Sequence, residues 1–108
     1  MEETSFGTQF LAESSTLVVR GCIEELDVTA FRDALREATH DYTSSVVVDL
    51  DGVTFMPSMA IGTLLGAMAR APGTRAKVGE GRPARRALEL LGLYEYAATG
   101  RQEHDLTG

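Results

Sequence analysis

The spacing of hydrophobic residues changes several times along the chain, and each change marks a new element of secondary structure. Residues 8–12 and 16–23 are extended segments rich in β-branched and apolar side chains, and the polar residues 13–15 separate them. This arrangement predicts a β-hairpin. From residue 27 onward the apolar positions recur three or four residues apart, which predicts an amphipathic helix. Its apolar stripe is Val28, Phe31, Leu35 and Ala38.

The middle of the chain predicts a buried strand followed by a second helix. Residues 46–50 form an apolar run typical of a strand in the interior of a sheet, and Asp51-Gly52 predicts a turn after it. Beyond Pro57 the apolar residues return to helical spacing, until the helix-breaking residues 71–73. The stripe consists of Ile61, Leu64, Leu65 and Met68. Two glycines four residues apart, Gly62 and Gly66, predict close packing of this helix on the sheet.

The last third continues the alternation of strand and helix. Residues 76–79 predict a short strand, a third helix starts near Pro83 and ends at Gly92, and residues 93–98 predict a short strand or a helical turn. Residues 99–108 are polar and are expected to be a loose tail. Because strands and helices alternate after the hairpin, we expect parallel strands in one sheet with helices packed against it, a small α/β sandwich.

Composition limits the class of protein. The 108 residues suit one domain over residues 1–108 with its core at about 8–98, and 44% hydrophobic with 24% charged residues is typical of a soluble globular protein. The apolar runs are far shorter than the roughly 20 residues of a membrane span. The acidic N-terminus lacks the pattern of a secretion signal, so a cytoplasmic location is expected.

Charge and cysteine content narrow the expected ligands and partners. Cys22 is the only cysteine, which excludes an internal disulfide and a cysteine-based zinc site, and no cofactor is expected. The formal net charge of -6 argues against direct binding to nucleic acid, because phosphate backbones need a basic face. The expected partner is therefore another protein, and a weak homodimer is left open.

Ser58 lies at the junction between the predicted central strand and the second helix. A hydroxyl at the start of a helix faces unpaired backbone N–H groups and the positive end of the helix dipole, so an added negative group is favoured there. Ser58 is therefore a candidate phosphorylation site. The alternative is a helix N-cap, whose oxygen accepts a backbone N–H bond. Both roles need the same position, so the sequence leaves both open.

Three stretches of the chain carry a resemblance to a known family. Residues 17–21 (LVVRG) followed by Ile23-Glu24 are similar to an apolar strand and a Gly-Glu-Leu-Asp turn, residues 46–55 to a central strand, and residues 82–93 to a last helix that closes with Leu-Gly-Leu. Together they resemble the STAS domain, the fold of anti-sigma factor antagonists, over about residues 8–98. The resemblance implies a mixed sheet of four to five strands with three to four helices packed against it, and a regulatory rather than an enzymatic protein.

The most specific part of this resemblance is the loop after the central strand. In antagonists of the family it reads Asp-Ser-Ser-Gly, and a kinase anti-sigma factor phosphorylates the first serine. Here the window is Pro57-Ser58-Met59-Ala60, followed by Ile61-Gly62. The resemblance therefore assigns the modified serine to Ser58. Its neighbours depart from the pattern: Pro57 removes a carboxylate and a backbone N–H, and Met59 and Ala60 make the loop bulkier and more apolar.

The resemblance implies a partner of the anti-sigma factor or serine kinase type that binds around Ser58 and is released by its phosphorylation. The expected contact residues are Met56, Pro57, Met59, Ala60 and Gly62. Methionine side chains repack easily at binding surfaces, although Met56 could equally fill the core. The alternative is a divergent STAS scaffold, or a module that binds a small ligand or lipid, without a phosphorylation switch.

An enzymatic site has little support in the sequence. Asp49, Asp51 and Glu24 could form a carboxylate pair or bind a metal, but they belong to different elements and no histidine lies near them in the sequence. Ser58 lacks the Gly-x-Ser-x-Gly environment of a hydrolytic nucleophile. We therefore expect no catalytic residues and no metal ligands.

Overall fold

Five strands form a single sheet in the order β1-β2-β3-β4-β5. The structure is a computed structural model that describes residues 5–90 and 97–98. The strands are β1 (Gly7–Leu11), β2 (Thr16–Cys22), β3 (Val47–Phe55), β4 (Arg75–Lys77) and β5 (Ala97–Ala98). The helices are α1 (Val28–Ala38), α2 (Ser58–Arg70) and α3 (Pro83–Leu90), with short 3₁₀ turns η1 (Ala12–Ser14) and η2 (Glu25–Asp27). The expected fold, a mixed sheet with helices packed against it, is confirmed.

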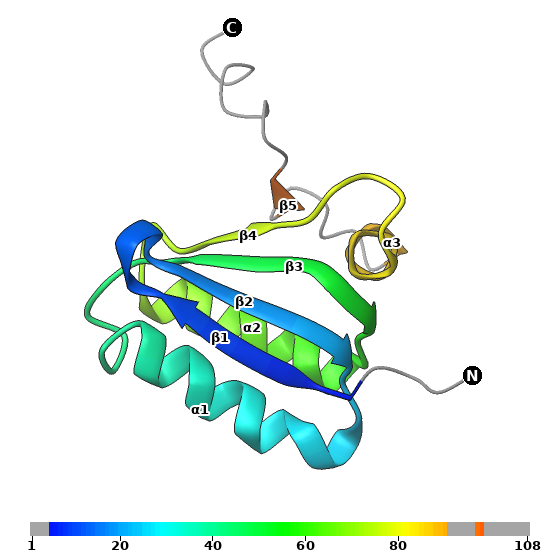
Figure 1. The fold of residues 1–108 in the computed structure, drawn as a ribbon, viewed down its shortest axis with the longest axis horizontal. Coiled ribbons are helices and arrows are strands. Elements are labelled where there is room, and N and C mark those ends of the chain that lie inside the picture. The colour runs from blue at the N-terminus through cyan, green and yellow to red at the C-terminus, as the bar shows by residue number, and fades with distance from the viewer. Residues whose placement is uncertain (1–4, 91–96, 99–108) are drawn as a thin grey trace, which may run out of the picture.

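The first two strands form the predicted antiparallel hairpin, and all later neighbours in the sheet are parallel. Parallel neighbours need a crossover, which α1, α2 and α3 supply. As a result β2, β3 and β4 all end at the same side of the sheet, on the right of Figure 1. We call this side the carboxyl edge: the ends of these three strands with residues 23–27, 56–57 and 78–82.

The predicted turn at Asp51-Gly52 is wrong, because β3 continues through both residues to Phe55. The backbone N–H of Asp51 donates to Asp49 Oδ1 at 3.0 Å. Gly52 lies against Arg20 of β2, where an added Cβ would be 3.1 Å from the Arg20 Cβ. The β2–β3 register shifts at this point. The polar residues and the glycine therefore mark a β-bulge with a close approach of two strands, which the sequence alone does not distinguish from a turn.

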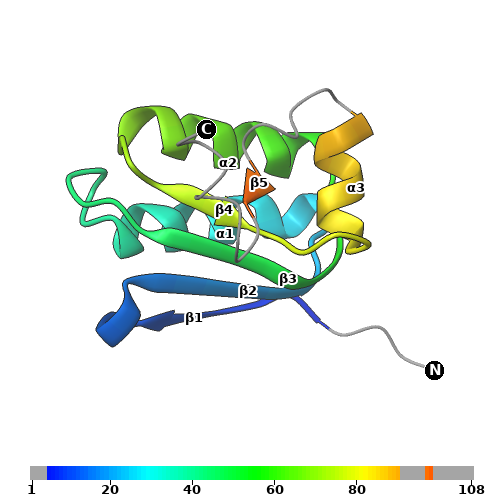
Figure 2. The ribbon, with the colours of Figure 1, turned by 90° about the horizontal axis from the view of Figure 1, so that it is seen from above.

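The core lies between the sheet and the helices. Figure 2 shows α1 and α2 on one face of the sheet, while no described helix covers the other face. All four residues of the predicted α1 stripe are buried, and they pack with the buried positions of β2 and β3. The largest fully buried side chains of this layer include Phe31, Ile23, Leu35, Leu50 and Leu64. Burying each such side chain stabilises the fold by about 1.5–3 kcal/mol, and this gain fixes the face that α1 and α2 turn to the sheet.

The prediction that α2 packs closely on the sheet through its glycines is wrong. Gly62 and Gly66 are exposed, and an added Cβ at either position would meet nothing within 4 Å. The buried residues of α2 are Ala60, Ile61, Leu64 and Ala67, so two alanines provide the close approach instead. The predicted helix end at Gly92, residues 93–96 and the predicted tail 99–108 lie outside the described residues.

Candidate functional site

Ser58 is the first residue of α2, and it is exposed at the carboxyl edge. The residue that caps the helix is Pro57, whose extended backbone (φ -73, ψ 164) presents its carbonyl to the first turn. This carbonyl accepts the N–H groups of Ala60 at 2.9 Å and Ile61 at 3.1 Å. The Ser58 hydroxyl makes no hydrogen bond to any described residue. The N-cap role for Ser58 is therefore wrong, and its hydroxyl is open to solvent.

The start of α2 is electrostatically suited to a negative group. The backbone N–H groups of Ser58 and Met59 precede the first intrahelical bonds, and no acceptor for either lies among the described residues. Free N–H groups and the helix dipole together favour an anion near the first turn. A phosphate on the Ser58 side chain would meet this environment without disturbing an existing hydrogen bond.

Only part of the expected contact surface is on the outside. Met59 is 58% exposed, Gly62 is exposed and Pro57 is half-buried. Met56 and Ala60, in contrast, are 5% and 0% exposed. Met56 fills the core beneath the loop, and Ala60 faces the sheet because it lies on the buried stripe of α2. Neither side chain can contact a docked protein, so both leave the list of contact residues.

The carboxyl edge holds two exposed apolar side chains that the sequence pattern did not single out. Phe55 ends β3 at 54% exposure, and Leu26 in η2 is 90% exposed. The end of β3 is joined to β2 by the N–H of Ile23, which donates to the Phe55 carbonyl at 3.0 Å. Strand alternation does not predict this exposure. Val53 points inward, at 1% exposure, so alternation predicts that Phe55, two residues later, is also buried. The bulge near Phe55 breaks that rule.

Asp51 ties β3 to the loop after β4. Its carboxylate accepts the Gly79 backbone N–H at 2.7 Å and Lys77 Nζ at 3.2 Å. Partial burial raises the pKa of Asp51, but the bonds from Gly79 and Lys77 and the charges of Lys77 and Arg82 outweigh it and hold this pKa below its ordinary value. The bond to Asp51 raises the pKa of Lys77 in turn, helped by the charge of Asp49.

We expect Asp51→Asn to lower the free energy of unfolding at pH 7 by about 0.5–1 kcal/mol, the range of solvent-screened ion pairs. Because the folded pKa of Asp51 lies below its unfolded value, its contribution is present above about pH 4 and is lost as the pH falls through the folded pKa. Urea titrations at pH 7 and pH 3 measure this. Glu80→Gln removes one charge from an exposed side chain in the same loop and serves as the control. An Asp51→Asn deficit that is as large at pH 3 as at pH 7 would contradict the ionic role.

The carboxylates of this region do not assemble a catalytic or metal site among the described residues. Asp49 and Asp51 share Lys77, whose Nζ is 3.9 Å from Asp49 Oδ2, and no histidine joins them. The backbone N–H of Glu24 donates to the Asp27 carboxylate at 2.9 Å within η2. In the described part of the chain no group of three His, Cys, Asp or Glu side chains could hold a metal ion. Nor does any described helix have the length and apolar character needed to cross a membrane.

A family model described as "Mlab, STAS domain" matches residues 6–98. The chain belongs to the STAS family. Its fold is similar to the unphosphorylated anti-sigma factor antagonist SpoIIAA, with a TM-score of 0.66 and 18% identity over 94% of this chain and 93% of that one. The phosphorylated Bacillus cell fate determinant SpoIIAA gives a TM-score of 0.61 and 19% identity over 95% and 97% of the two chains. No curated protein sequence matches significantly. The STAS fold is thus shown.

Proposed function

We propose that this STAS domain is an anti-sigma factor antagonist-like regulator. It binds an anti-sigma factor or a related serine kinase-type protein at the carboxyl edge, and phosphorylation of Ser58 releases that partner. The observation that carries the proposal is the position of the Ser58 hydroxyl: exposed at the start of α2, without a hydrogen-bond partner among the described residues, and next in sequence to exposed Met59. The similarity to SpoIIAA supports the class of function.

The exposed apolar side chains support a protein partner. Three large apolar side chains are exposed at or next to this edge, Leu26, Phe55 and Met59, and a partner that covers them gains the free energy of burying their apolar surface. Aromatic and methionine side chains are also enriched in the centres of protein interfaces. The partner proposed here covers these side chains and packs over Pro57 and the outer face of α2 at Gly62.

The charge of a phosphate supplies the release step. Phosphoserine carries about -1.5 to -2 charges at pH 7, which a docked apolar surface would have to bury. The same edge already carries Glu24 and Glu25, which are exposed. The helix N-terminus stabilises the phosphate in the free protein, so phosphorylation favours the dissociated state over the complex.

Ser58→Asp tests the switch because it places a negative charge at this position. Ser58→Asn is the control, since asparagine has nearly the same shape as aspartate but no charge. We expect Asp to weaken binding to an ATP-binding anti-sigma factor of the same organism at least tenfold, about 1.4 kcal/mol, and Asn to change it less than threefold. Calorimetric titration of the three proteins measures both effects. If all three proteins bound the anti-sigma factor equally well, the phosphorylation switch would be overturned, while the proposed partner would still stand. No binding by the wild type would overturn the partner.

The alternative is a STAS scaffold, or a module that binds a small ligand or lipid, without a switch. The sequence around Ser58 favours it: Pro57 removes one backbone N–H, and the fully buried Ala60 stands where the family has glycine. Incubation with a cognate kinase and ATP, followed by intact-mass measurement, separates the two functions. The proposed switch requires one added phosphate on the wild type and none on Ser58→Ala.

A further inference from the structure

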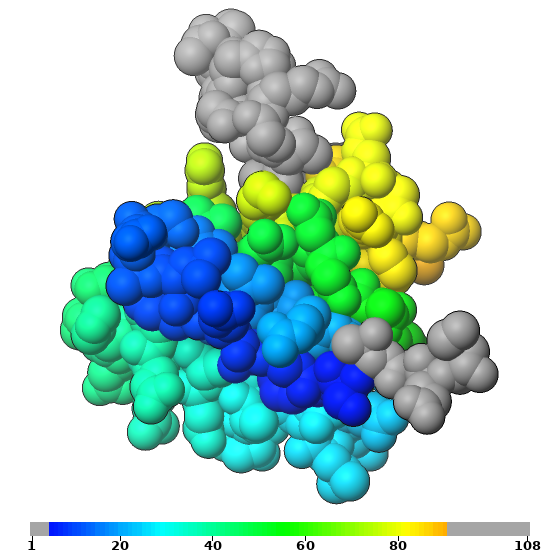
Figure 3. Space-filling view, in the orientation of Figure 1, coloured from blue at the N-terminus to red at the C-terminus, as the bar shows by residue number. Residues whose placement is uncertain are grey.

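In the part of the chain that the structure describes, the outer edge of the sheet is a strand with no pairing partner on one side. β1 is the first strand in the sheet order, and among the described residues nothing pairs with its outer side. Its five residues, GTQFL, contain no charge and no proline, the usual devices that keep an edge strand from pairing. Phe10 and Leu11 are each 40% exposed. Figure 3 shows this strand on the surface next to α1.

A groove runs between β1 and α1. Its volume is about 190 Å³, and its lining is mostly apolar: Phe10 of β1, Leu17 of β2, and Ala34 and Ala38 of α1. Thr8 and Phe10 pair with the buried residues Val19 and Leu17 of β2, so their side chains lie on the helix side of β1, and both line the groove together with Gln9 between them. A strand added to the edge of β1 would therefore direct every second side chain toward this groove.

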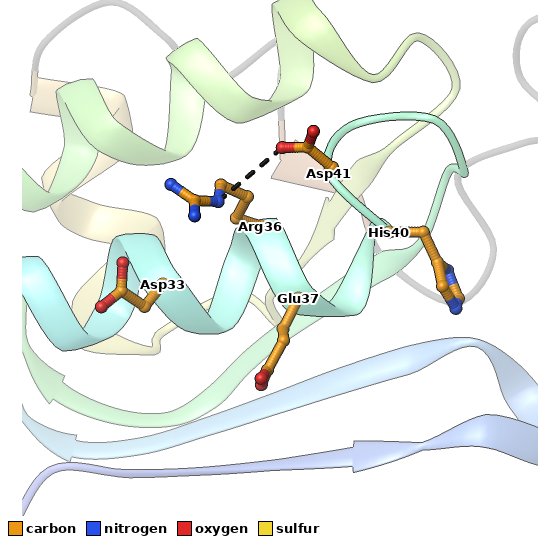
Figure 4. A pocket seen from close by; sticks show the side chains of 5 residues that line it. All are labelled: Asp33, Arg36, Glu37, His40 and Asp41. Atoms are coloured by element: carbon orange, nitrogen blue, oxygen red, sulfur yellow. Dashed lines mark ion pairs between the residues drawn. The ribbon is translucent and has the colours of Figure 1, made fainter.

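The groove is acidic where it meets α1. Glu37 lines it, and Glu37 also lines a neighbouring hollow together with Asp33, Arg36, His40 and Asp41. Neither carboxylate has an ion pair among the described residues, because Arg36 pairs with Asp41 at 3.7 Å instead. Figure 4 shows Glu37 pointing from α1 toward the strands while Arg36 turns toward Asp41. A basic side chain entering here would find an unpaired negative charge.

We propose that the β1 edge binds an extended segment of another protein by strand addition, with an apolar side chain in the groove and a lysine or arginine against Glu37. Backbone pairing would supply affinity, and the groove with its carboxylate would supply specificity. The proposed segment is basic because charge complementarity selects the partner. A second copy of this chain fits poorly, since pairing two β1 edges about a twofold axis would bring the acidic α1 flanks of both copies together. None of the groove residues belongs to the carboxyl edge, so this surface is independent of the Ser58 switch.

Two capped hexapeptides test the inference by two-dimensional amide NMR titration. In acetyl-Thr-Val-Thr-Lys-Thr-Val-amide the valines and the lysine lie on one face of a strand, and the second peptide has Glu in place of Lys. We expect the lysine peptide to shift the amide signals of residues 7–11 and to bind at least about fivefold more tightly than the glutamate peptide. Glu37→Lys should reverse this preference, and its exposed position leaves the fold intact. Glu80→Lys, which adds the same charge elsewhere, should not.

Three results would overturn the proposal. They are absence of shifts at residues 7–11 with either peptide, equal binding of both peptides, and shifts of these residues that depend on protein concentration without any peptide. The last result would assign the edge to self-association.

Discussion

Replacing Phe31 by alanine should lower the free energy of unfolding by about 3–5 kcal/mol, the cost of removing a buried aromatic ring and leaving a cavity. Phe31 is 0% exposed in the first turn of α1, and its ring meets that of Phe6 edge-on with centroids 6.4 Å apart. The total free energy of unfolding of such a domain is about 5–15 kcal/mol, so this loss is a large share of it. Urea unfolding followed by circular dichroism measures the change, since the chain contains no tryptophan to report by fluorescence.

Phe10→Ala is the matched control for the same side chain in a different environment. Phe10 is 40% exposed on the edge strand, so its loss should cost less than about 2 kcal/mol. Equal destabilisation by the two substitutions would contradict the placement of Phe31 in the main core.

Glutamate at position 60 should destabilise the fold by at least about 3 kcal/mol, because Ala60 is 0% exposed and the new carboxylate would have no partner there. Glutamate at the neighbouring position 59 should change the stability by no more than about 0.5 kcal/mol. Met59 is 58% exposed, and a negative charge in the first turn of α2 is favoured by the helix dipole.

This pair tests the orientation of α2, on which the exposure of Ser58 depends. Thermal unfolding of Met59→Glu and Ala60→Glu at neutral pH compares the two positions directly. If both variants unfolded at the same temperature, the orientation of α2 about its axis, and with it the exposure of Ser58 to solvent, would be contradicted.

Periodicity predicted α1 correctly because one face of this helix packs on the sheet and large apolar residues mark that face. Every residue of the predicted stripe is buried, from Val28 to Ala38. For α2 the same reasoning was only partly correct. Leu65 and Met68 are half-buried, whereas Ala60 and Ala67 are fully inside. Small residues allow close approach of a helix to a sheet, and a pattern weighted toward large side chains does not reveal them.

The candidate site, too, could be predicted from the sequence only in part. The position of Ser58 at the start of α2 follows from local sequence, because Pro57 and the apolar spacing after it define the helix start. The exposure of Phe55 and the burial of Met56 do not, since they depend on the bulged register between β2 and β3. The link from Asp51 to Gly79 spans 28 positions in the chain, and only the folded sheet brings these two residues together.

The hairpin connection η1 has a practical consequence for experiments. Residues 12–14 are all exposed, and they lie at the left of Figure 1, while the Ser58 end of the sheet lies at the right. Exposed connections of this kind tolerate inserted sequence well. A fluorescent tag or a split reporter placed between Glu13 and Ser14 would therefore follow docking events in living cells while leaving the Ser58 end unobstructed.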